Sequence, residues 1–148
     1  MKQPQLELSR PFTAARVSPK GSFEKIFADK AECAALARRY GVPAIHAVAA
    51  ELRIKPWRGG GLNVSGEVKC DLEMVSVISL EAFRQTETFK VQRYFLPNVP
   101  EGESDDDFDV ISGGHIDLGE VVAETIALEL DPYPRKPGET FAANDNGK

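Results

Sequence analysis

The sequence predicts an α+β protein in which an antiparallel sheet of about four to six strands, including a long hairpin, is packed by two helices. Three observations predict it: a capped helix pattern near residue 30, a long alternation of apolar and polar residues around a glycine-rich turn, and a second capped helix pattern near residue 117. The chain has 148 residues, 42% hydrophobic and 28% charged, as in ordinary globular domains. We therefore expect one domain, residues 1–131, followed by a tail.

The first helix is predicted over Lys30–Tyr40. Asp29 and Glu32 form a capping-box pattern, in which each side chain accepts a hydrogen bond from the other residue's backbone amide. An apolar stripe with helical spacing predicts one buried face, and it consists of Cys33, Leu36, Ala37 and Tyr40. Gly41 favours the left-handed turn that ends a helix, and Pro43 prevents the helix from continuing.

A long hairpin follows this helix. Residues 48–55 alternate between apolar and charged side chains, which is the period of a half-buried strand. Residues 58–61 form a glycine-rich turn, and residues 62–72 alternate again with the same period. The two segments therefore predict antiparallel neighbours in one sheet.

Two further strands are predicted at 75–80 and 88–96, the second with Phe89 on one side and Tyr94 on the other. Residues 97–109 contain two prolines and six carboxylates and too little apolar content to pack, so we expect a mobile, exposed acidic loop.

The second helix is predicted to begin at the cap Asp117, with Glu120 three residues later, and to end near Leu130 before Pro132. It is expected to cover the sheet. Residues 132–148 are polar and rich in proline, which predicts an extended or disordered tail.

Charge is unevenly distributed along the chain. Residues 1–70 contain 12 Lys or Arg and 6 Asp or Glu, a difference of +6, whereas residues 71–148 contain 6 and 17, a difference of −11. If the halves separate in space, a basic surface can meet RNA phosphates while an acidic surface meets a basic protein. Two solvated surfaces without a partner are the alternative.

The compartment is predicted from cysteine usage and hydropathy. Two isolated cysteines are too few for a disulfide framework, which favours a reducing compartment, and we expect the cytoplasm. Residues 1–11 lack the apolar stretch of a signal peptide, and no run of 18 uncharged apolar residues occurs, so no membrane association is expected.

The sequence predicts no metal and no cofactor. A structural zinc site requires about four Cys or His ligands in close pairs, and the chain has only four scattered candidates, Cys33, Cys70, His46 and His115. Both cysteines have positions typical of small core residues, and both histidines are interpreted as loop residues.

No catalytic motif is present, so we expect that the protein is not an enzyme. The glycines at 59–61 lack the Lys-Ser/Thr ending of a phosphate loop. The aspartates at 105–107 and 109 lack the glycine turn and terminal glutamate of an EF-hand loop and are interpreted as solvated. Their carboxylates are the sole motive for a hydrolase or nuclease hypothesis.

One feature favours nucleic acid. Trp57 and Arg58 lie at the predicted hairpin tip, with Arg53 and Lys55 on the same strand and Lys69 on its partner. Bases stack on indoles while cationic groups hold phosphates, so these five residues are the candidate RNA-binding residues. In the alternative, the tryptophan packs against a neighbouring strand and the cations are an ordinary solvated face.

Seven segments, taken in order, carry a resemblance to a known family, and they are 34–40, 49–52, 57–58, 77–83, 95–97, 116–124 and 128–136. Over roughly residues 5–138 the order of elements resembles the YceD-like family, the large ribosomal RNA subunit accumulation proteins, the last two segments in the form found in alphaproteobacteria. Many relatives have a Cys-x-x-Cys pair where this chain has Ser76 and Ser79, and a later cysteine that is absent here. Metal or redox properties of those relatives are therefore not expected.

The resemblance implies a bacterial, non-enzymatic factor for accumulation and processing of large-subunit ribosomal RNA and for ribosome assembly, with large-subunit ribosomal RNA or a basic ribosomal protein as partner. Asp117, Glu120 and Glu124 are the candidate partner-docking residues, although a helix cap alone explains the first two. The alternative is an acidic protein-interaction module with no direct RNA contact, which uses residues 101–109 or 132–138. We expect a monomer, and dimerisation through a sheet edge is the other possibility.

Overall fold

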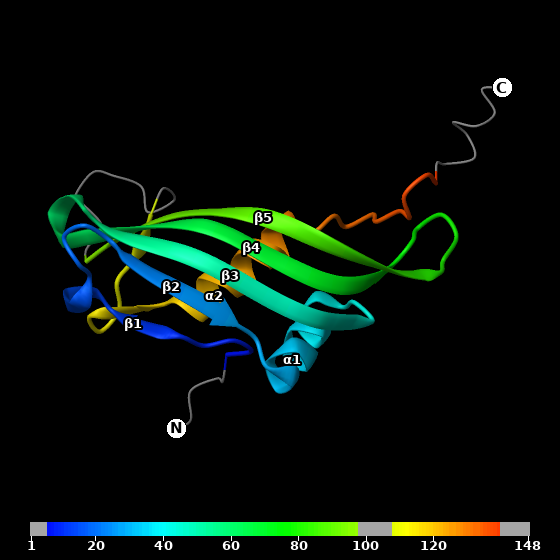
Figure 1. Ribbon diagram of the computed structural model, residues 1–148, viewed down its shortest axis with the longest axis horizontal. Helices are drawn as coiled ribbons and strands as arrows, with labels where there is room; N and C mark the ends of the chain where they lie inside the picture. The colour runs from blue at the N-terminus through cyan, green and yellow to red at the C-terminus, as the bar shows by residue number, and fades with distance from the viewer. Residues whose placement is uncertain (1–5, 98–107, 140–148) are drawn as a thin grey trace.

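A long, twisted five-stranded sheet is the main layer of the structure (Figure 1). The computed structural model describes residues 6–97 and 108–139. The strands are β1 (Pro11–Thr13), β2 (Ser22–Phe27), β3 (Ala44–Trp57), β4 (Gly61–Val75), β5 (Ala82–Leu96), β6 (Asp109–Val110) and β7 (His115–Asp117), and the α-helices are α1 (Lys30–Tyr40) and α2 (Leu118–Glu129).

The main sheet has the strand order β2-β3-β4-β5-β6, and β1 pairs with β7 in a separate two-stranded sheet. All neighbours in the main sheet are antiparallel except β5 and β6, which are parallel. The predicted α+β fold is therefore confirmed, with a short parallel strand added at one edge.

The long hairpin is also confirmed. β3 and β4 pair from Ala44 and Glu73 to Trp57 and Gly61, with one irregularity between Ile45 and Ala47. Residues 58–60 form the predicted turn as a short 3-10 segment.

The helix α1 has the predicted bounds because its signals are local. Asp29 accepts a hydrogen bond from the amide of Glu32 at 2.8 Å, and Glu32 accepts one from the amide of Asp29 at 2.9 Å. Gly41 ends the helix in the left-handed conformation with φ of 71°.

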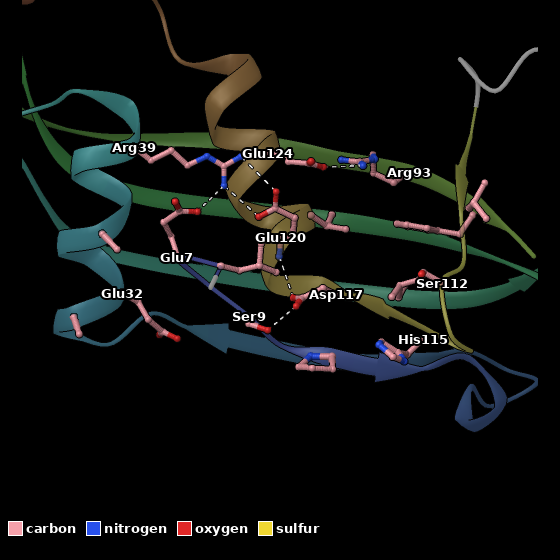
Figure 2. Close-up of a pocket in the computed structure, with 18 of the residues that line it drawn as sticks. Glu7, Ser9, Glu32, Arg39, Arg93, Ser112, His115, Asp117, Glu120 and Glu124 are labelled. Atoms are coloured by element: carbon pink, nitrogen blue, oxygen red, sulfur yellow. Dashed lines mark hydrogen bonds and ion pairs between the residues drawn. The ribbon is translucent and has the colours of Figure 1, made fainter. Parts of the chain in front are cut away.

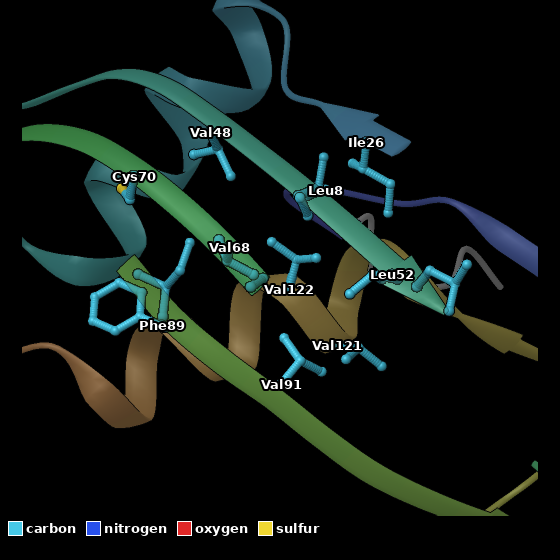
Figure 3. Packing of buried hydrophobic residues seen from close by; sticks show 14 of the residues in the cluster. Leu8, Ile26, Val48, Leu52, Val68, Cys70, Phe89, Val91, Val121 and Val122 are labelled. Atoms are coloured by element: carbon cyan, nitrogen blue, oxygen red, sulfur yellow. The ribbon is translucent and has the colours of Figure 1, made fainter. Parts of the chain in front are cut away.

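Both helices pack on the same face of the sheet, which the inward residues of β3, β4 and β5 line (Figure 3). From α1, Cys33 and Leu36 enter this core, and from α2, Val121 and Val122 do so. The inward residues of β3 are Val48, Ala50, Leu52 and Ile54, which the period of two had placed together. Cys33 and Cys70 are both buried, which confirms that they are core residues.

The N-terminal segment around Leu8 and Arg10 positions the start of α2. A Cβ atom on Gly119 would lie 2.6 Å from the carbonyl oxygen of Leu8, so only glycine allows the buried Leu8 segment to cross α2 this closely. The amide of Leu118 then donates to the carbonyl of Arg10 at 2.9 Å. Neither α-helix of the described residues has the length and apolar content needed to cross a membrane.

The predicted strand at 75–80 is wrong. β4 ends at Val75, and the Ser76 hydroxyl accepts hydrogen bonds from the amides of Ile78 and Ser79 at 3.1 and 3.2 Å. Leu80 has φ of 62° and donates its amide to the carbonyl of Ser76. These local bonds make a turn, and β5 begins at Ala82 rather than at residue 88.

Residues 132–139 have no regular secondary structure and lie against this turn. The amide of Val77 donates to the carbonyl of Pro134 at 2.9 Å, and Lys136 forms an ion pair with Glu81. The rest of the predicted tail, residues 140–148, and residues 98–107 of the predicted acidic loop lie outside the described residues.

Candidate nucleic-acid interface

The face of the sheet opposite the helices is open to solvent in the described part of the chain (Figure 1). Strand pairing orders its outward side chains into rows across the sheet. One row joins Phe23, Arg53, Ser65 and Gln92, the next joins Lys55, Asn63 and Tyr94, and Trp57 ends the series beside the turn. We call these eight residues, together with Arg58 of the turn, the tip surface.

The tip surface contains cations and aromatic rings and no carboxylate among its nine residues. Arg53, Lys55 and Arg58 are its cations. Arg53 lies over the ring of Phe23, with 4.5 Å from the guanidinium carbon to the ring centroid. A basic surface with aromatic rings fits the phosphates and bases of a single-stranded nucleic acid.

Trp57 is half-buried at the end of β3. Its ring centroid lies 4.6 Å from that of Tyr94 and 6.4 Å from that of Phe108, and the Arg58 guanidinium lies over the indole at 4.8 Å. The packing alternative for the tryptophan therefore holds for part of its surface. The same contacts hold the indole beside the Arg58 guanidinium, and Arg53 and Lys55 lie on the same side of β3, an arrangement that suits base stacking next to phosphate contacts.

The structure does not bring Lys69 to the tip surface. It lies opposite Ala49, four positions along β3 from Arg53, in the other half of the open face. That half contains Lys25, Lys69, Arg84 and Lys90 together with the carboxylates Glu51, Glu67, Asp71 and Glu73. The four cations and four carboxylates of this half balance, so the surface around Lys69 has no excess of positive charge for phosphates.

Sequence reasoning missed Phe23 and placed Tyr94 on a polar strand face without joining it to Trp57. The alternation of residues 22–27 is a signal for β2, but it cannot show which residue of β3 pairs with Phe23. Register determines that Arg53 meets this ring.

The opposite face contains a groove of about 1380 Å³ between α1, α2 and the β1–β7 segment (Figure 2). Five carboxylates and three arginines line it. The three predicted partner-docking residues Asp117, Glu120 and Glu124 are among them, so the structure does bring these residues together.

Each of these carboxylates already has an intramolecular partner. Asp117 accepts from the amides of Arg10 at 2.7 Å and Glu120 at 3.1 Å, and from the Ser9 hydroxyl at 2.5 Å. Asp117 is therefore a helix cap that also fixes the N-terminal segment.

Glu120 pairs with Arg39 at 3.1 Å instead of completing a capping box, and Arg39 also contacts Glu7 at 3.1 Å. Burial raises the pKa of Glu120, while the hydrogen bond from Arg39 acts in the opposite direction. The pair joins α1 to α2 across the groove (Figure 2).

Glu124 pairs with Arg93 of β5 at 2.9 Å, and Arg93 also contacts Asp109 at 2.7 Å. Burial by itself lowers the pKa of Arg93, but its hydrogen bonds to these two carboxylates raise it. The groove charges thus tie α2 to the sheet and to α1.

The candidate metal ligands and the two histidines form no metal site among the described residues. No group of three or more His, Cys, Asp or Glu there has the arrangement of a metal site. Neither histidine is the loop residue that was expected. His46 lies in β3, and its Nε2 lies 2.8 Å from a carboxylate oxygen of Glu73. His115 lies in β7, a three-residue strand. Residues 105–107 lie outside the described residues, and Asp109 is paired with Arg93.

The structure is that of an α+β protein whose five-stranded sheet has one face packed by helices and one face open to solvent. Residues 64–147, more than half of the chain, match the family described as large ribosomal RNA subunit accumulation protein YceD. The chain therefore belongs to the YceD family, as the resemblance had predicted. No curated protein and no solved structure matches the chain.

The matched segment begins within β4, at residue 64, and contains β5, β6, β7 and α2. Of the tip surface, it includes Ser65, Gln92 and Tyr94, and the other residues precede it. The family name links the chain to accumulation of the large-subunit ribosomal RNA.

Proposed function

We propose that this protein supports the accumulation of large-subunit ribosomal RNA in the cytoplasm by binding RNA directly on the tip surface, without catalysing a reaction. The observation that carries the proposal is the tip surface itself, where Trp57 and Tyr94 stand beside Arg53, Lys55 and Arg58 with no carboxylate among them. The family name supplies the class of RNA.

Charge explains how an acidic protein can bind RNA at this place. The whole chain has a net charge of −5 and therefore repels polyanions at long range. Within about one Debye length, roughly 8 Å at physiological salt, the local cations of the tip surface dominate. We therefore expect weak non-specific binding and a short binding site on unpaired RNA.

Depletion of the protein in its native bacterium tests the proposal. The ratio of large-subunit to small-subunit ribosomal RNA should fall over several generations and recover with the wild-type gene. The double variant Trp57→Ala/Lys55→Gln should not restore the ratio, whereas Lys69→Gln, on the carboxylate-rich half of the same face, should restore it. Full recovery with the double variant at wild-type protein levels contradicts the proposal.

A second candidate function is docking of a basic ribosomal protein on the helix side. The groove favours it because its lining has five carboxylates against three arginines, and α2 has acidic but no basic residues. Glu7→Gln, in the groove lining, should then weaken binding of ribosomal proteins freed from RNA, because it removes one of the five carboxylates. Unchanged protein binding, with normal RNA binding, excludes this function.

A further inference from the structure

Two phenylalanines lie in solvent on the edge strand of the sheet. Phe23 and Phe27 of β2 are each 65% exposed, although a phenylalanine side chain gains about 1.5–3 kcal/mol from burial. Both point to the open face, because they alternate with the buried Ile26. β2 pairs only with β3, so its outer edge has no neighbouring strand within the described residues.

Cations surround these rings. Lys25 lies between them on the same side of β2, and Arg53 lies over Phe23 at 4.5 Å from its centroid. Within residues 6–97 and 108–139, neither Lys25 nor Arg53 has an ion-pair partner, so their charge is not neutralised by the fold. Glu51, opposite Lys25 in the strand register, is the one carboxylate beside them on β3.

We propose that Phe23, Lys25, Phe27 and Arg53, here called the edge platform, bind a single-stranded RNA segment, with bases stacked on both rings and phosphates held by the two cations. The inference rests on the proposed function and extends its surface from the hairpin tip along β2. The edge platform and the tip surface are continuous, since Phe23 and Arg53, which are paired in the strand register, belong to both.

Geometry favours an unpaired strand. The two rings are four residues apart on one strand, about 13 Å at roughly 3.3 Å per residue. This distance is several times the ~3.4 Å rise of a stacked strand, so the rings take bases that are not adjacent. Lys25 lies between the rings, where the intervening phosphates pass. A duplex, whose bases are already paired and stacked, cannot use the platform.

Charge disfavours a second copy of the chain as the occupant. The antiparallel register that sets Phe23 against Phe27 of another β2 also sets the two Lys25 side chains opposite each other. Like charges directly opposite on neighbouring strands are destabilising. A polyanion with aromatic bases satisfies both the rings and the lysine.

The test is binding of a fluorescently labelled, mixed-sequence single-stranded RNA of about 12 nucleotides, within the range that such surfaces cover. Phe23→Ala and Phe27→Ala should each weaken binding about tenfold. Phe→Tyr at either position should retain binding, whereas Phe→Leu should not, because leucine keeps the apolar contact but has no ring. Tyr133→Ala, which removes an aromatic residue 69% exposed in the 132–139 segment, should bind as the wild type does.

Glu51→Gln supplies a gain-of-binding test, since it removes the carboxylate next to Lys25. It should tighten RNA binding several-fold at low salt, with the advantage shrinking as salt rises. A purely structural role for the platform would not produce this change.

The outcomes separate this inference from the proposed function. If the wild type binds both a large-subunit ribosomal RNA transcript and the short RNA, and the Phe→Leu variants bind equally well, the edge platform is overturned while the proposed function stands. Binding of the transcript but not of the short single strand also overturns it. If the wild type binds neither RNA, direct RNA contact itself fails. A concentration-dependent dimer that Phe27→Leu or Phe23→Leu abolishes, with RNA binding unchanged, identifies the platform as a self-association surface instead.

Discussion

Leu52 and Arg53 are neighbours in the chain and lie on opposite faces of the same strand. Leu52 is fully buried against the helices, and Arg53 lies on the open face over Phe23. On the helix side, Arg39 and Arg93 are each paired with two carboxylates. On the tip surface, Arg53 lies over the ring of Phe23 and Arg58 lies over the indole of Trp57. The comparison indicates that Arg39 and Arg93 stabilise the fold, whereas Arg53 lies over an aromatic ring and has no ion-pair partner among the described residues.

The largest expected difference is in the free energy of unfolding after substitution of these two neighbours. Leu52→Ala should lower the free energy of unfolding by about 3 kcal/mol, since it removes buried methyl groups and leaves a cavity. Arg53→Ala should change it by less than about 0.5 kcal/mol. Urea denaturation measures both. A loss for Arg53→Ala as large as that for Leu52→Ala would contradict the division between the faces.

Arg93 and Lys90 provide the same comparison for two charges on β5. Arg93→Met should cost about 1–2 kcal/mol of unfolding free energy, because it leaves Asp109 and Glu124 without their partner. Partial exposure of both carboxylates keeps the cost below that of a fully buried pair. Lys90→Met, on the open face, is the matched control and should remain within about 0.5 kcal/mol of the wild type.

A smaller effect depends on pH. The hydrogen bond from Arg10 lowers the pKa of Glu32 below its usual value. A carboxyl whose pKa is depressed in the folded state adds stability above its unfolded pKa and loses it as pH falls through the folded pKa. Glu32→Gln, which can still cap α1, should therefore cost about 0.5–1 kcal/mol at pH 7.

This difference between wild type and Glu32→Gln should vanish as the pH falls through the folded pKa of Glu32. Thermal or urea unfolding at neutral and acidic pH measures it. A constant difference across that range would show that the Arg10–Glu32 pair does not contribute through charge.

Thiol labelling distinguishes the two faces with the smallest expected change in stability. Cys70 is buried, and desolvation raises its pKa to about 12, so it should not react with a thiol reagent at neutral pH until the protein unfolds. Lys69→Cys places a thiol one residue away on the open face, where labelling should be complete in the folded state. Equal rates at both positions would mean that the two faces are not distinguished as described.

Local signals predicted much of this structure. The bounds of α1 follow from Asp29, Glu32 and Gly41, all within one turn of its ends. The strand error at 75–80 arose because the Ser76 side chain closes a turn that hydropathy alternation does not reveal. β1 was not predicted because its partner β7 lies about a hundred residues later in the chain.

The candidate site was predictable only in part. Period two placed Arg53 and Lys55 on one side of β3, as the structure has them, and Trp57 was predicted at the hairpin tip, where it lies. It could not separate Lys69 from them or bring Phe23 and Tyr94 to them, since those relations depend on register between strands. The Arg39 and Arg93 pairs of the groove join elements far apart in sequence and have no local signal.

The salt dependence of RNA binding tests the central claim most directly. For a single strand, the slope of log affinity against log salt is about −0.7 for each phosphate contact. The double variant Arg53→Ala/Lys55→Ala should make this slope shallower by about 1.4. Arg38→Ala, which removes an exposed cation of the helix-side groove, should leave it unchanged. An unchanged slope in the double variant, or an equal change in Arg38→Ala, would contradict RNA binding on the open face.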